Sequence, residues 1–248
     1  MAAPQEAPMD IKGKTVLVTG SAGRVGKQIA LYLAGKGANI IVHYLHSDAE
    51  ARQTAAEIRK KRVKAIAVRA DLTQEDEVAQ LFAAGRKAFG RVDVLVNSAA
   101  AFRKTPLSKA AASDLDFFYQ TNVRSGYLCS LLFARQARKG VIVNIGDWAA
   151  ERPYMDYLPY LISKGAIPTM TRAFAKELAP GIRVNCILPG PVLLPRHIPA
   201  AEKREAIAGT LVQRAGSPLD IAQAVVFLIE NEFVTGACLS VDGGRSCG

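Results

Sequence analysis

The stretch "TVLVTGSAGRVGKQIA", residues 15–30, combines three patterns that together decide the fold. It opens on an apolar run closed by Gly20, which predicts a strand buried on both faces. A turn rich in glycine and other small residues follows. Val25, Ile29 and Leu33 then recur at a spacing of four, which predicts a helix with one buried face. A strand, a glycine-rich turn and a helix in this order begin an α/β fold.

Short apolar runs alternate with longer helical patterns along the rest of the chain. Strands that are apolar on both faces belong in a parallel sheet covered by helices. The order therefore predicts the α/β class, with a Rossmann-like doubly wound parallel sheet flanked by helices. The predicted strands span residues 15–20, 39–44, 64–70, 92–97, 140–146 and 182–190, and the predicted helices span residues 25–36, 48–61, 75–89, 113–138, 157–178 and 218–230.

The 248 residues suffice for one domain with a sizeable core. We expect a disordered N-terminal tail over residues 1–12 and a single Rossmann-type catalytic domain over residues 13–248. The segment "PGPVLLPRHIPAAEKRE", residues 189–205, is rich in proline and lies between the last predicted elements. A loop of that length usually serves function, so we interpret it as a substrate-binding loop.

The composition limits the classes of partner. The chain carries 32 Lys+Arg against 22 Asp+Glu, a formal net charge of +10. Apart from "RKKRVK" at residues 59–64, the basic residues are scattered, which favours anionic small molecules over nucleic acid. The four cysteines have no metal-site spacing, and no apolar run reaches membrane-spanning length. The first ten residues lack signal-peptide features, so we expect a cytoplasmic protein with no membrane or nucleic-acid partner and no metal.

The glycine-rich turn predicts a dinucleotide site. Gly20, Gly23 and Gly26 would let the backbone approach a pyrophosphate, whose charge would face the N-terminus of the first helix. The usual GxGxxG spacing is absent. The position of the turn between the first strand and the first helix nevertheless favours a dinucleotide site over an ordinary tight turn.

The end of the second predicted strand, "VHYLHSDAE", indicates which dinucleotide binds. An NAD enzyme tends to offer a carboxylate here to the ribose 2′-hydroxyl. This chain offers the donors His43, Tyr44, His46 and Ser47 before the first acid, Asp48. Donors suit a 2′-phosphate, so we predict NADPH over NADH. The alternatives stay open that the histidines are ordinary strand-end residues and that Ser47 caps the next helix.

A tyrosine and a lysine one helical turn apart predict a proton-donating pair. A tyrosine hydroxyl has a pKa of ~10, too high for ready proton exchange near neutrality. Lys164 follows Tyr160 at i+4, on the same helix face, and would lower that pKa by stabilising the phenolate. Tyr154 and Tyr157 have leucine at the same spacing. A hydride-transfer reaction needs such a donor.

An ordered set of motifs resembles the short-chain dehydrogenase/reductase family over residues 14 to 244. The motifs are "TGxxxxxG" at the first turn, "DL" at residues 71–72, Asn97, "NV" at residues 122–123, Tyr160-x-x-x-Lys164 and "RVNCILPG" at residues 183–190. The resemblance implies a sheet of about seven parallel strands, a nicotinamide cofactor and usually a homotetramer.

The resemblance, read together with the patterns above, implies a set of site residues. Asn122 would hold a water that continues the proton path, and Lys164 would also bind the nicotinamide ribose. The expected catalytic residues are Asn122, Asp147, Tyr160 and Lys164. The expected cofactor-binding residues are Gly20, Ser21, Arg24, Val25, His43, Tyr44, His46, Ser47, Asp71, Leu72, Asn97, Ala99, Tyr160, Lys164, Gly190 and Val192.

Three departures from the commonest family pattern point to one branch. Arg24 stands where the family usually has glycine, "NSAA" replaces Asn-Asn-Ala-Gly at residues 97–100, and Asp147 replaces a serine. Together with "HYLHS" at residues 43–47 and Phe102, these departures resemble the pteridine reductases. In that branch the aspartate and the tyrosine act as a proton relay for reduction of the pterin ring.

Asp147 is the departure with the most direct chemical meaning. In a carbonyl reductase the serine donates to the oxygen that gains negative charge. An ionised carboxylate cannot donate and suits a ring nitrogen or N–H group instead. Phe102 could stack on a flat heteroaromatic ring, and Arg24 could donate both to cofactor phosphate and to the substrate. The expected substrate-binding residues are therefore Arg24, Phe102, Asp147 and Tyr160.

We therefore predict an NADPH-dependent reductase that converts a dihydropterin or dihydrofolate to its tetrahydro form. One alternative is a carbonyl reductase of 3-oxoacyl or small ketone substrates, which would require a protonated Asp147. A second alternative is an NADPH-binding sensor without turnover, against which the intact Tyr160 and Lys164 count.

Overall fold

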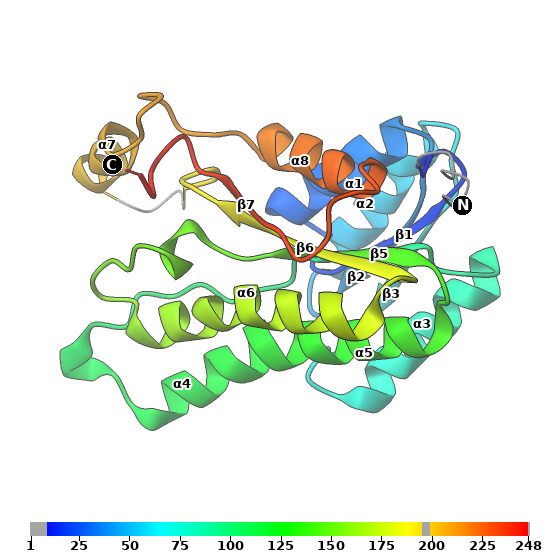
Figure 1. The fold of residues 1–248 in the computed structure, drawn as a ribbon, viewed down its shortest axis with the longest axis horizontal. Helices are drawn as coiled ribbons and strands as arrows, with labels where there is room; N and C mark the ends of the chain where they lie inside the picture. The colour runs from blue at the N-terminus through cyan, green and yellow to red at the C-terminus, as the bar shows by residue number, and fades with distance from the viewer. Residues whose placement is uncertain (1–8, 195–198, 248) are drawn as a thin grey trace, which may run out of the picture.

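The computed structural model describes residues 9–194 and 199–247. Seven strands alternate with helices along the chain (Figure 1). The strands are β1 (Thr15–Val18), β2 (Asn39–Tyr44), β3 (Ala65–Arg69), β4 (Val94–Asn97), β5 (Gly140–Ile145), β6 (Ile182–Pro189) and β7 (Cys238–Val241). The α-helices are α1 (Arg24–Gly35), α2 (Asp48–Arg59), α3 (Glu75–Phe89), α4 (Ala112–Phe118), α5 (Ser125–Gln136), α6 (Leu158–Leu178), α7 (Ala200–Ala208) and α8 (Pro218–Glu230).

The strands form one parallel sheet in the order β3-β2-β1-β4-β5-β6-β7. The chain runs outward from β1 to β3 and then returns to β4 on the other side of β1. This reversal makes the sheet doubly wound, as the alternating pattern predicts. It also leaves a crevice at the carboxyl ends of β1 and β4, where such folds bind their ligands.

Each face of the sheet carries its own helices, with α1, α2 and α8 on one and α3, α5 and α6 on the other (Figure 1). The alternation within β1 shows why. Val16 and Val18 pack in the first core, and Leu17 packs in the second. All three side chains are fully buried. The continuous apolar run of the sequence is thus the signature of a strand covered on both faces.

The predicted helix over residues 113–138 is interrupted. Between α4 and α5 lies one π-helical segment, Tyr119–Arg124, which contains Asn122. Such a segment adds a residue to the helical turn and is found mostly at functional sites. The hydrophobic pattern is compatible with either winding, so the sequence could not show the interruption.

Two predicted boundaries also differ from the structure. Ile11 falls in the predicted tail but is only 1% exposed and belongs to the core under α1, while residues 1–8 lie outside the described chain. Part of the predicted loop 189–205 is helical, because α7 begins at Ala200, and residues 195–198 of that loop are not described.

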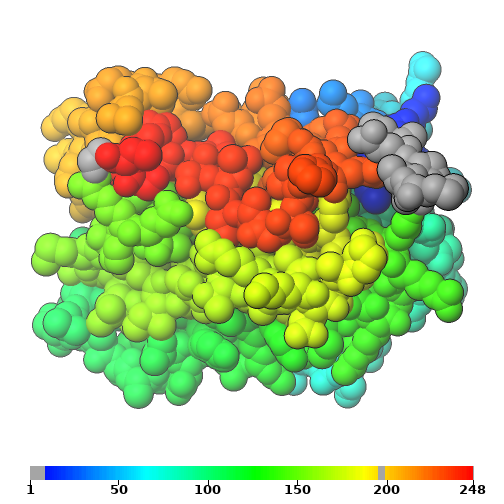
Figure 2. All heavy atoms as spheres, viewed as in Figure 1, coloured from blue at the N-terminus to red at the C-terminus, as the bar shows by residue number. Residues whose placement is uncertain are grey.

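The C-terminal residues lie beside α7 on one side and the segment near residue 150 on the other (Figure 2). They therefore reach the same edge of the sheet as the carboxyl ends of the strands.

Candidate active site

A continuous cleft of about 1520 Å³ runs along the carboxyl edge of the sheet. The glycine-rich turn and the ends of β2, β4, β5 and β6 form its walls, and α7 and the C-terminal segment border it. Small-ligand pockets typically enclose about 300–1,000 Å³. The cleft therefore has room for a dinucleotide and a second small molecule.

The glycine-rich turn is shaped by close backbone approaches. Gly20 has a left-handed φ of 63°, and a Cβ on it would lie 2.8 Å from the Ala99 Cα. A Cβ on Gly26 would lie 2.5 Å from the Gly20 carbonyl oxygen. Only glycine fits at either position, and the turn leads directly into the N-terminus of α1. The donors and the shape of this cradle fit a dinucleotide pyrophosphate.

His43 supports this turn and has no free donor for a phosphate. Its Nδ1 accepts from the Gly20 N–H at 3.0 Å, and its Nε2 lies 3.0 Å from the Ala70 carbonyl, to which it donates. Burial lowers the pKa of His43 to about 4, so the ring is neutral. The prediction that His43 donates to a 2′-phosphate is therefore wrong, because both ring nitrogens are already bonded within the fold.

The residues at and after the end of β2 differ in whether their donors are available at the ribose end of the cleft. The Tyr44 hydroxyl donates to Asp48, whose carboxylate also pairs with Arg52 at 2.8 Å. His46 and Ser47 are exposed and line the cleft, and Ser47 makes no helix cap. The free donors are thus His46 and Ser47, while the Tyr44 hydroxyl is committed to Asp48.

Two expected cofactor ligands turn away from the cleft. The Ser21 hydroxyl is buried and donates to the Val18 carbonyl at 2.7 Å. The Asn97 amide donates to Asn144 at 2.9 Å and to Ser130 at 3.1 Å, behind the sheet edge. Their side chains therefore stabilise the strand ends and do not face the cleft.

The other expected ligands on this side do line the cleft, namely Arg24, Val25, Asp71, Leu72, Ala99, Gly190 and Val192. Asp71 accepts from the Thr73 N–H and hydroxyl, which fixes the turn after β3. The Gly190 N–H donates to the Val241 carbonyl, which leaves the Gly190 carbonyl for a ligand.

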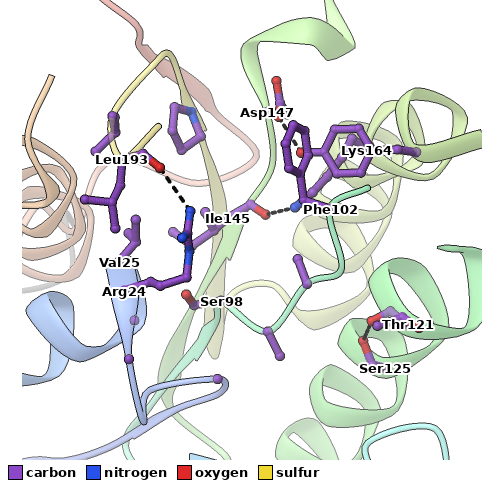
Figure 3. A pocket seen from close by; sticks show the side chains of 18 of the residues that line it. Arg24, Val25, Ser98, Phe102, Thr121, Ser125, Ile145, Asp147, Lys164 and Leu193 are labelled. Carbon is purple, nitrogen blue, oxygen red and sulfur yellow. Dashed lines mark hydrogen bonds between the residues drawn. The ribbon is translucent and has the colours of Figure 1, made fainter. Parts of the chain in front are cut away.

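Arg24 reaches across the cleft. Its backbone is left-handed, with a φ of 53°, at a position where glycine would be unstrained. Its guanidinium donates to the Leu193 carbonyl at 2.9 Å, and the two residues face each other from opposite walls (Figure 3). The side chain therefore sits over the glycine-rich turn, as a ligand to an anionic group would.

Asp147 and Tyr160 form the centre of the site. Asp147 follows β5, and its Oδ1 accepts from the Ala149 N–H at 2.9 Å. Its Oδ2 accepts from the Tyr160 hydroxyl at 2.5 Å. Lys164 lies one turn further along α6, and its Nζ donates to the Ile145 carbonyl at 2.9 Å (Figure 3). The structure thus brings these three residues together at the cleft, and their catalytic role stays a prediction.

The protonation of these groups differs from the expectation for a tyrosine–lysine pair. Burial raises the pKa of Tyr160 well above its usual value, and the Asp147 charge raises it further. Burial also raises the pKa of Asp147, against the opposing effects of the Tyr160 and Ala149 hydrogen bonds and the Lys164 charge. Burial lowers the pKa of Lys164. The expected lowering of the Tyr160 pKa is therefore not found, since burial and the neighbouring carboxylate both favour the protonated phenol.

Asn122 does not reach the cleft with its side chain. Its Oδ1 accepts from the Ala101 N–H at 2.7 Å, and its Nδ2 donates to the Ala101 carbonyl and to the Ser163 hydroxyl. The amide thus bridges to the neighbouring backbone and fixes the residue that precedes Phe102. Its predicted role in a water relay stays a prediction.

A row of aromatic rings borders the centre of the site, and the sequence could not orient most of it. The Phe102 ring stacks on Tyr157 at 4.9 Å and meets Tyr160 edge-on at 4.9 Å. Trp148 stacks on Tyr154 at 5.5 Å, and Tyr154 meets Tyr157 at 5.2 Å. Phe102 itself is 48% exposed and lines the cleft, so part of its ring is accessible to a ligand.

Some lining residues were not predicted individually from the sequence, although two of them, Glu202 and Glu205, fall in the predicted loop 189–205. Lys104, Glu202, Glu205 and Arg245 border the cleft beyond the aromatic row. They come from three separate segments, and only folding brings them together.

Within residues 9–194 and 199–247, no group of three or more His, Cys, Asp and Glu side chains is arranged to hold a metal ion. In the same ranges, no helix has both the length and the apolar character needed to cross a membrane.

Comparisons with known proteins agree with this architecture. A family model described as "Enoyl-(Acyl carrier protein) reductase" matches residues 20–246. A short-chain type dehydrogenase/reductase from Picea abies is 33% identical over 250 residues, which cover 94% of this chain and 92% of the relative. The 7alpha-hydroxysteroid dehydrogenase of Escherichia coli (strain K12) is 34% identical over 243 residues, which cover 94% of both proteins.

A solved structure shows the same fold. It is a 7 alpha-hydroxysteroid dehydrogenase complexed with NADH and 7-oxo glycochenodeoxycholic acid. It matches this chain with a TM-score of 0.90 and 33% identity, over 94% of each chain.

Proposed function

The chain belongs to the short-chain dehydrogenase/reductase family, and we propose that within it the chain is an NADPH-dependent reductase of a pterin ring. It is an oxidoreductase that works with a nicotinamide cofactor. The proposed substrate is a dihydropterin or dihydrofolate, which would be reduced to the tetrahydro form.

The observation that carries the proposal is the hydrogen bond from Tyr160 to Asp147 Oδ2. A carbonyl reductase needs two donors aimed at the carbonyl oxygen. Here the tyrosine proton is directed at a carboxylate, and both carboxylate oxygens are acceptors. A substrate that presents N–H groups and a ring nitrogen matches this arrangement better than a ketone does.

When bound, the nicotinamide supplies the hydride. The protein must then deliver a proton to the ring nitrogen next to the reduced carbon. Burial raises the pKa of Asp147, so its protonated form persists to a higher pH than that of an exposed carboxyl group, as a proton donor requires. Tyr160 holds the carboxyl group in place through their shared hydrogen bond, along which the proposed relay returns a proton to Asp147. Lys164, fixed to the Ile145 carbonyl, stabilises the Asp147 carboxylate that the transfer to the ring leaves.

Phe102 is proposed to stack on the pterin. Its ring is held by Tyr157 and Tyr160, so little side-chain entropy is lost on binding. An aromatic pair of this kind contributes about 1 kcal/mol beyond the burial of area.

The preference for NADPH is supported by the donors at the ribose end of the cleft. His46 and Ser47 are exposed to the cleft without a carboxylate between them. Asp48, the nearest acid, is occupied by Tyr44 and Arg52, so it is less able to accept from a ribose 2′-hydroxyl. Arg24 supplies a cation that suits the cofactor phosphates.

A carbonyl reductase is the second candidate, and the raised pKa of Asp147 favours it. A protonated Asp147 would become a donor, and together with Tyr160 it could bind a carbonyl oxygen. The relatives named 7alpha-hydroxysteroid dehydrogenase are consistent with such a substrate class. A sensor without turnover is less well supported, since Asp147, Tyr160 and Lys164 converge in one cleft.

The deciding experiment follows NADPH consumption with 7,8-dihydrobiopterin, dihydrofolate, an acetoacetyl thioester and a 7-oxo bile acid. We expect turnover of the pterins, with a rate that falls as the pH rises through the raised pKa of Asp147. Turnover of the thioester or the bile acid alone would overturn the pterin proposal in favour of the carbonyl reductase. Tight NADPH binding without any turnover would favour the sensor, and equal rates with NADH would overturn the cofactor preference.

A homotetramer in the cytoplasm is also proposed. Exposed apolar side chains on α5 and α6, among them Tyr127 and Ile162, support self-association. Light scattering of the purified protein tests it, and a monomer at micromolar concentration would contradict it.

A further inference from the structure

The C-terminal segment brings an arginine to the far end of the cleft. Arg245 lies almost a hundred residues beyond Asp147 in the chain, yet its side chain borders the same cleft. Its guanidinium lies over the Trp148 ring, 5.2 Å from the ring centroid. Because Trp148 directly follows Asp147, Arg245 occupies the end of the aromatic row that begins at Phe102.

The backbone around Arg245 is held in place by Asp242. One oxygen of this carboxylate accepts from the Gly244 N–H at 2.9 Å, and the other accepts from the Ser246 N–H at 2.7 Å. Gly243 and Gly244 both adopt the left-handed conformation, with φ of 66° and 78°. These two hydrogen bonds and the two left-handed glycines turn the chain so that Arg245 points back toward the cleft and not into solvent.

The side chain of Arg245 has its own seat against α7. Its Nη1 donates to the Glu205 carbonyl at 3.2 Å, near the negative end of that helix. A Cβ on Gly209 would lie 0.9 Å from this Nη1, so the space that the guanidinium fills exists only because residue 209 is glycine. The position of the charge is therefore specified by two separate segments.

No carboxylate of residues 9–194 and 199–247 pairs with the Arg245 charge. Among the described residues, Arg103 pairs with Asp114 and Lys104 pairs with Asp156, but no acidic side chain lies within ion-pair distance of Arg245. Its only described acceptor is the Glu205 carbonyl. A fixed guanidinium with spare N–H groups at the border of a cleft is a receptor for a carboxylate or phosphate.

Two glutamates of α7, Glu202 and Glu205, also border the cleft. Both side chains are exposed, so water screens their repulsion of a bound anion. The attraction between Arg245 and an anion seated beside Trp148 is screened less. The two glutamates would therefore lower the affinity for an anion at this end of the cleft without preventing its binding.

We propose that Arg245 binds the anionic group of the substrate side chain, so that the enzyme prefers pterins carrying a carboxylate or a phosphate. This inference rests on the proposed pterin reduction and adds the substrate class to it. The aromatic row would hold the ring at Phe102, and the side chain would run past Trp148 to the guanidinium. Both anions share the recognition chemistry, and the substrates below distinguish them.

The test compares three substrates with the intact protein and NADPH. They are dihydrofolate, which carries carboxylates, 7,8-dihydroneopterin phosphate, and the uncharged 7,8-dihydrobiopterin. We expect kcat/KM to be higher for at least one anionic substrate, and Arg245→Gln to reduce that advantage about tenfold through KM. Activity with dihydrobiopterin should stay within about twofold. The anionic substrate with the larger loss identifies the natural anion.

Two further variants make the test specific. Arg204→Gln removes the same charge from an exposed position of α7 that does not border the cleft, so it should leave the ratio unchanged. Gly209→Ala keeps Arg245 but fills its seat, and its ordinary φ of −78° tolerates alanine. It should reproduce the loss of Arg245→Gln, and the double variant should lose no more than either single one.

The possible outcomes separate the two proposals. An unchanged ratio in Arg245→Gln, an equal loss in Arg204→Gln, or a wild-type preference for dihydrobiopterin overturns the role of Arg245 while leaving pterin reduction in place. Absence of turnover with all three pterins overturns the proposed function itself and the inference with it.

Discussion

The glycine-rich turn and the centre of the site are built on opposite principles. At the glycine-rich turn the shape comes from backbone, and the buried side chain that supports it, His43, is neutral with both nitrogens bonded. At the centre of the site three ionisable side chains, Asp147, Tyr160 and Lys164, are buried together. The first region stabilises the fold while it shapes the cofactor site. The second opposes folding, because buried ionisable groups cost free energy, and we propose that this cost serves catalysis.

Asp147→Asn should have the largest effect of the proposed variants. It tests directly whether the centre of the site gives up stability for activity. Losing a group that transfers a proton typically lowers the rate 10²–10⁴-fold, so we expect about a 10³-fold loss of pterin kcat. The same change should raise stability at neutral pH. Burial raises the folded-state pKa of Asp147 above its unfolded value, so the ionised form is destabilising above that pKa.

The measurement pairs steady-state kinetics with thermal melts at several pH values. The variant should melt above the wild type at pH 8, and the difference should vanish below about pH 4, where the carboxyl is protonated in both states. Asp116, an exposed carboxylate on α4, gives the control Asp116→Asn. A variant that loses both activity and stability at pH 8 would mean that Asp147 is a structural group.

His43, at the glycine-rich turn, should make the stability of the protein decrease at acidic pH. Its pKa falls from 6.5 to about 4 on folding, so the folded state binds fewer protons. Its contribution is complete above pH 6.5 and is lost as the pH falls toward 4. The shift corresponds to about 3 kcal/mol of stability.

Urea unfolding between pH 7.5 and 4 measures this effect. His43→Asn keeps an acceptor near the position of Nδ1 for the Gly20 N–H, so it should fold and lose most of the pH dependence. His46→Asn alters an exposed histidine and should keep the wild-type profile. A wild-type stability that does not decline below pH 6.5 would contradict the neutral, structural histidine.

Most of the fold was readable from the sequence because its signals are local. A continuous apolar run such as residues 15–18 is enough to indicate a strand covered on both faces. The run at β7 is short and half-exposed, so only the family resemblance indicated a seventh strand. Tyr160 and Lys164 were found because a helical turn fixes their spacing.

The rest of the site depends on partners far apart in the chain. His43 is engaged by Gly20, and Asn97 by Asn144, 47 residues away. Nothing in the sequence shows that these polar groups are already satisfied inside the fold. Arg245 was missed for the same reason, since its seat at Gly209 and its contact with Trp148 exist only after folding.

Gly26→Ala should affect the backbone-built region by a smaller amount. Its Cβ would press on the Gly20 carbonyl, a backbone atom that cannot move without opening the turn. Overpacking of this kind costs about 2 kcal/mol, and NADPH affinity should fall at the same time.

Gly35→Ala is the matched control. Gly35 lies on the same helix, and a Cβ there would have nothing within 4 Å, so the substitution should stabilise the protein by about 0.5–1 kcal/mol. Urea unfolding and fluorescence titration with NADPH measure both effects, and equal behaviour of the two variants would contradict the close approach.

Phe102→Leu should have the smallest effect and would sharpen the comparison at the substrate end. Phe102 is half-exposed and carries no charge, so its loss neither relieves nor adds a buried ionisable group. Leucine keeps much of the apolar area and removes the ring, so pterin binding should weaken by about 1 kcal/mol, or about fivefold in KM. Stability should change little, because the ring is half-exposed and its ring contacts among the described residues are with Tyr157 and Tyr160. A matched Phe117→Leu substitution, in an exposed ring on α4 that also borders the cleft, tests whether the loss belongs to stacking at Phe102. If KM for the pterin rises equally in both variants, the ring at Phe102 does not stack on the substrate. If it rises in Phe102→Leu alone, substrate binding at this end depends on side chains that the fold itself does not need.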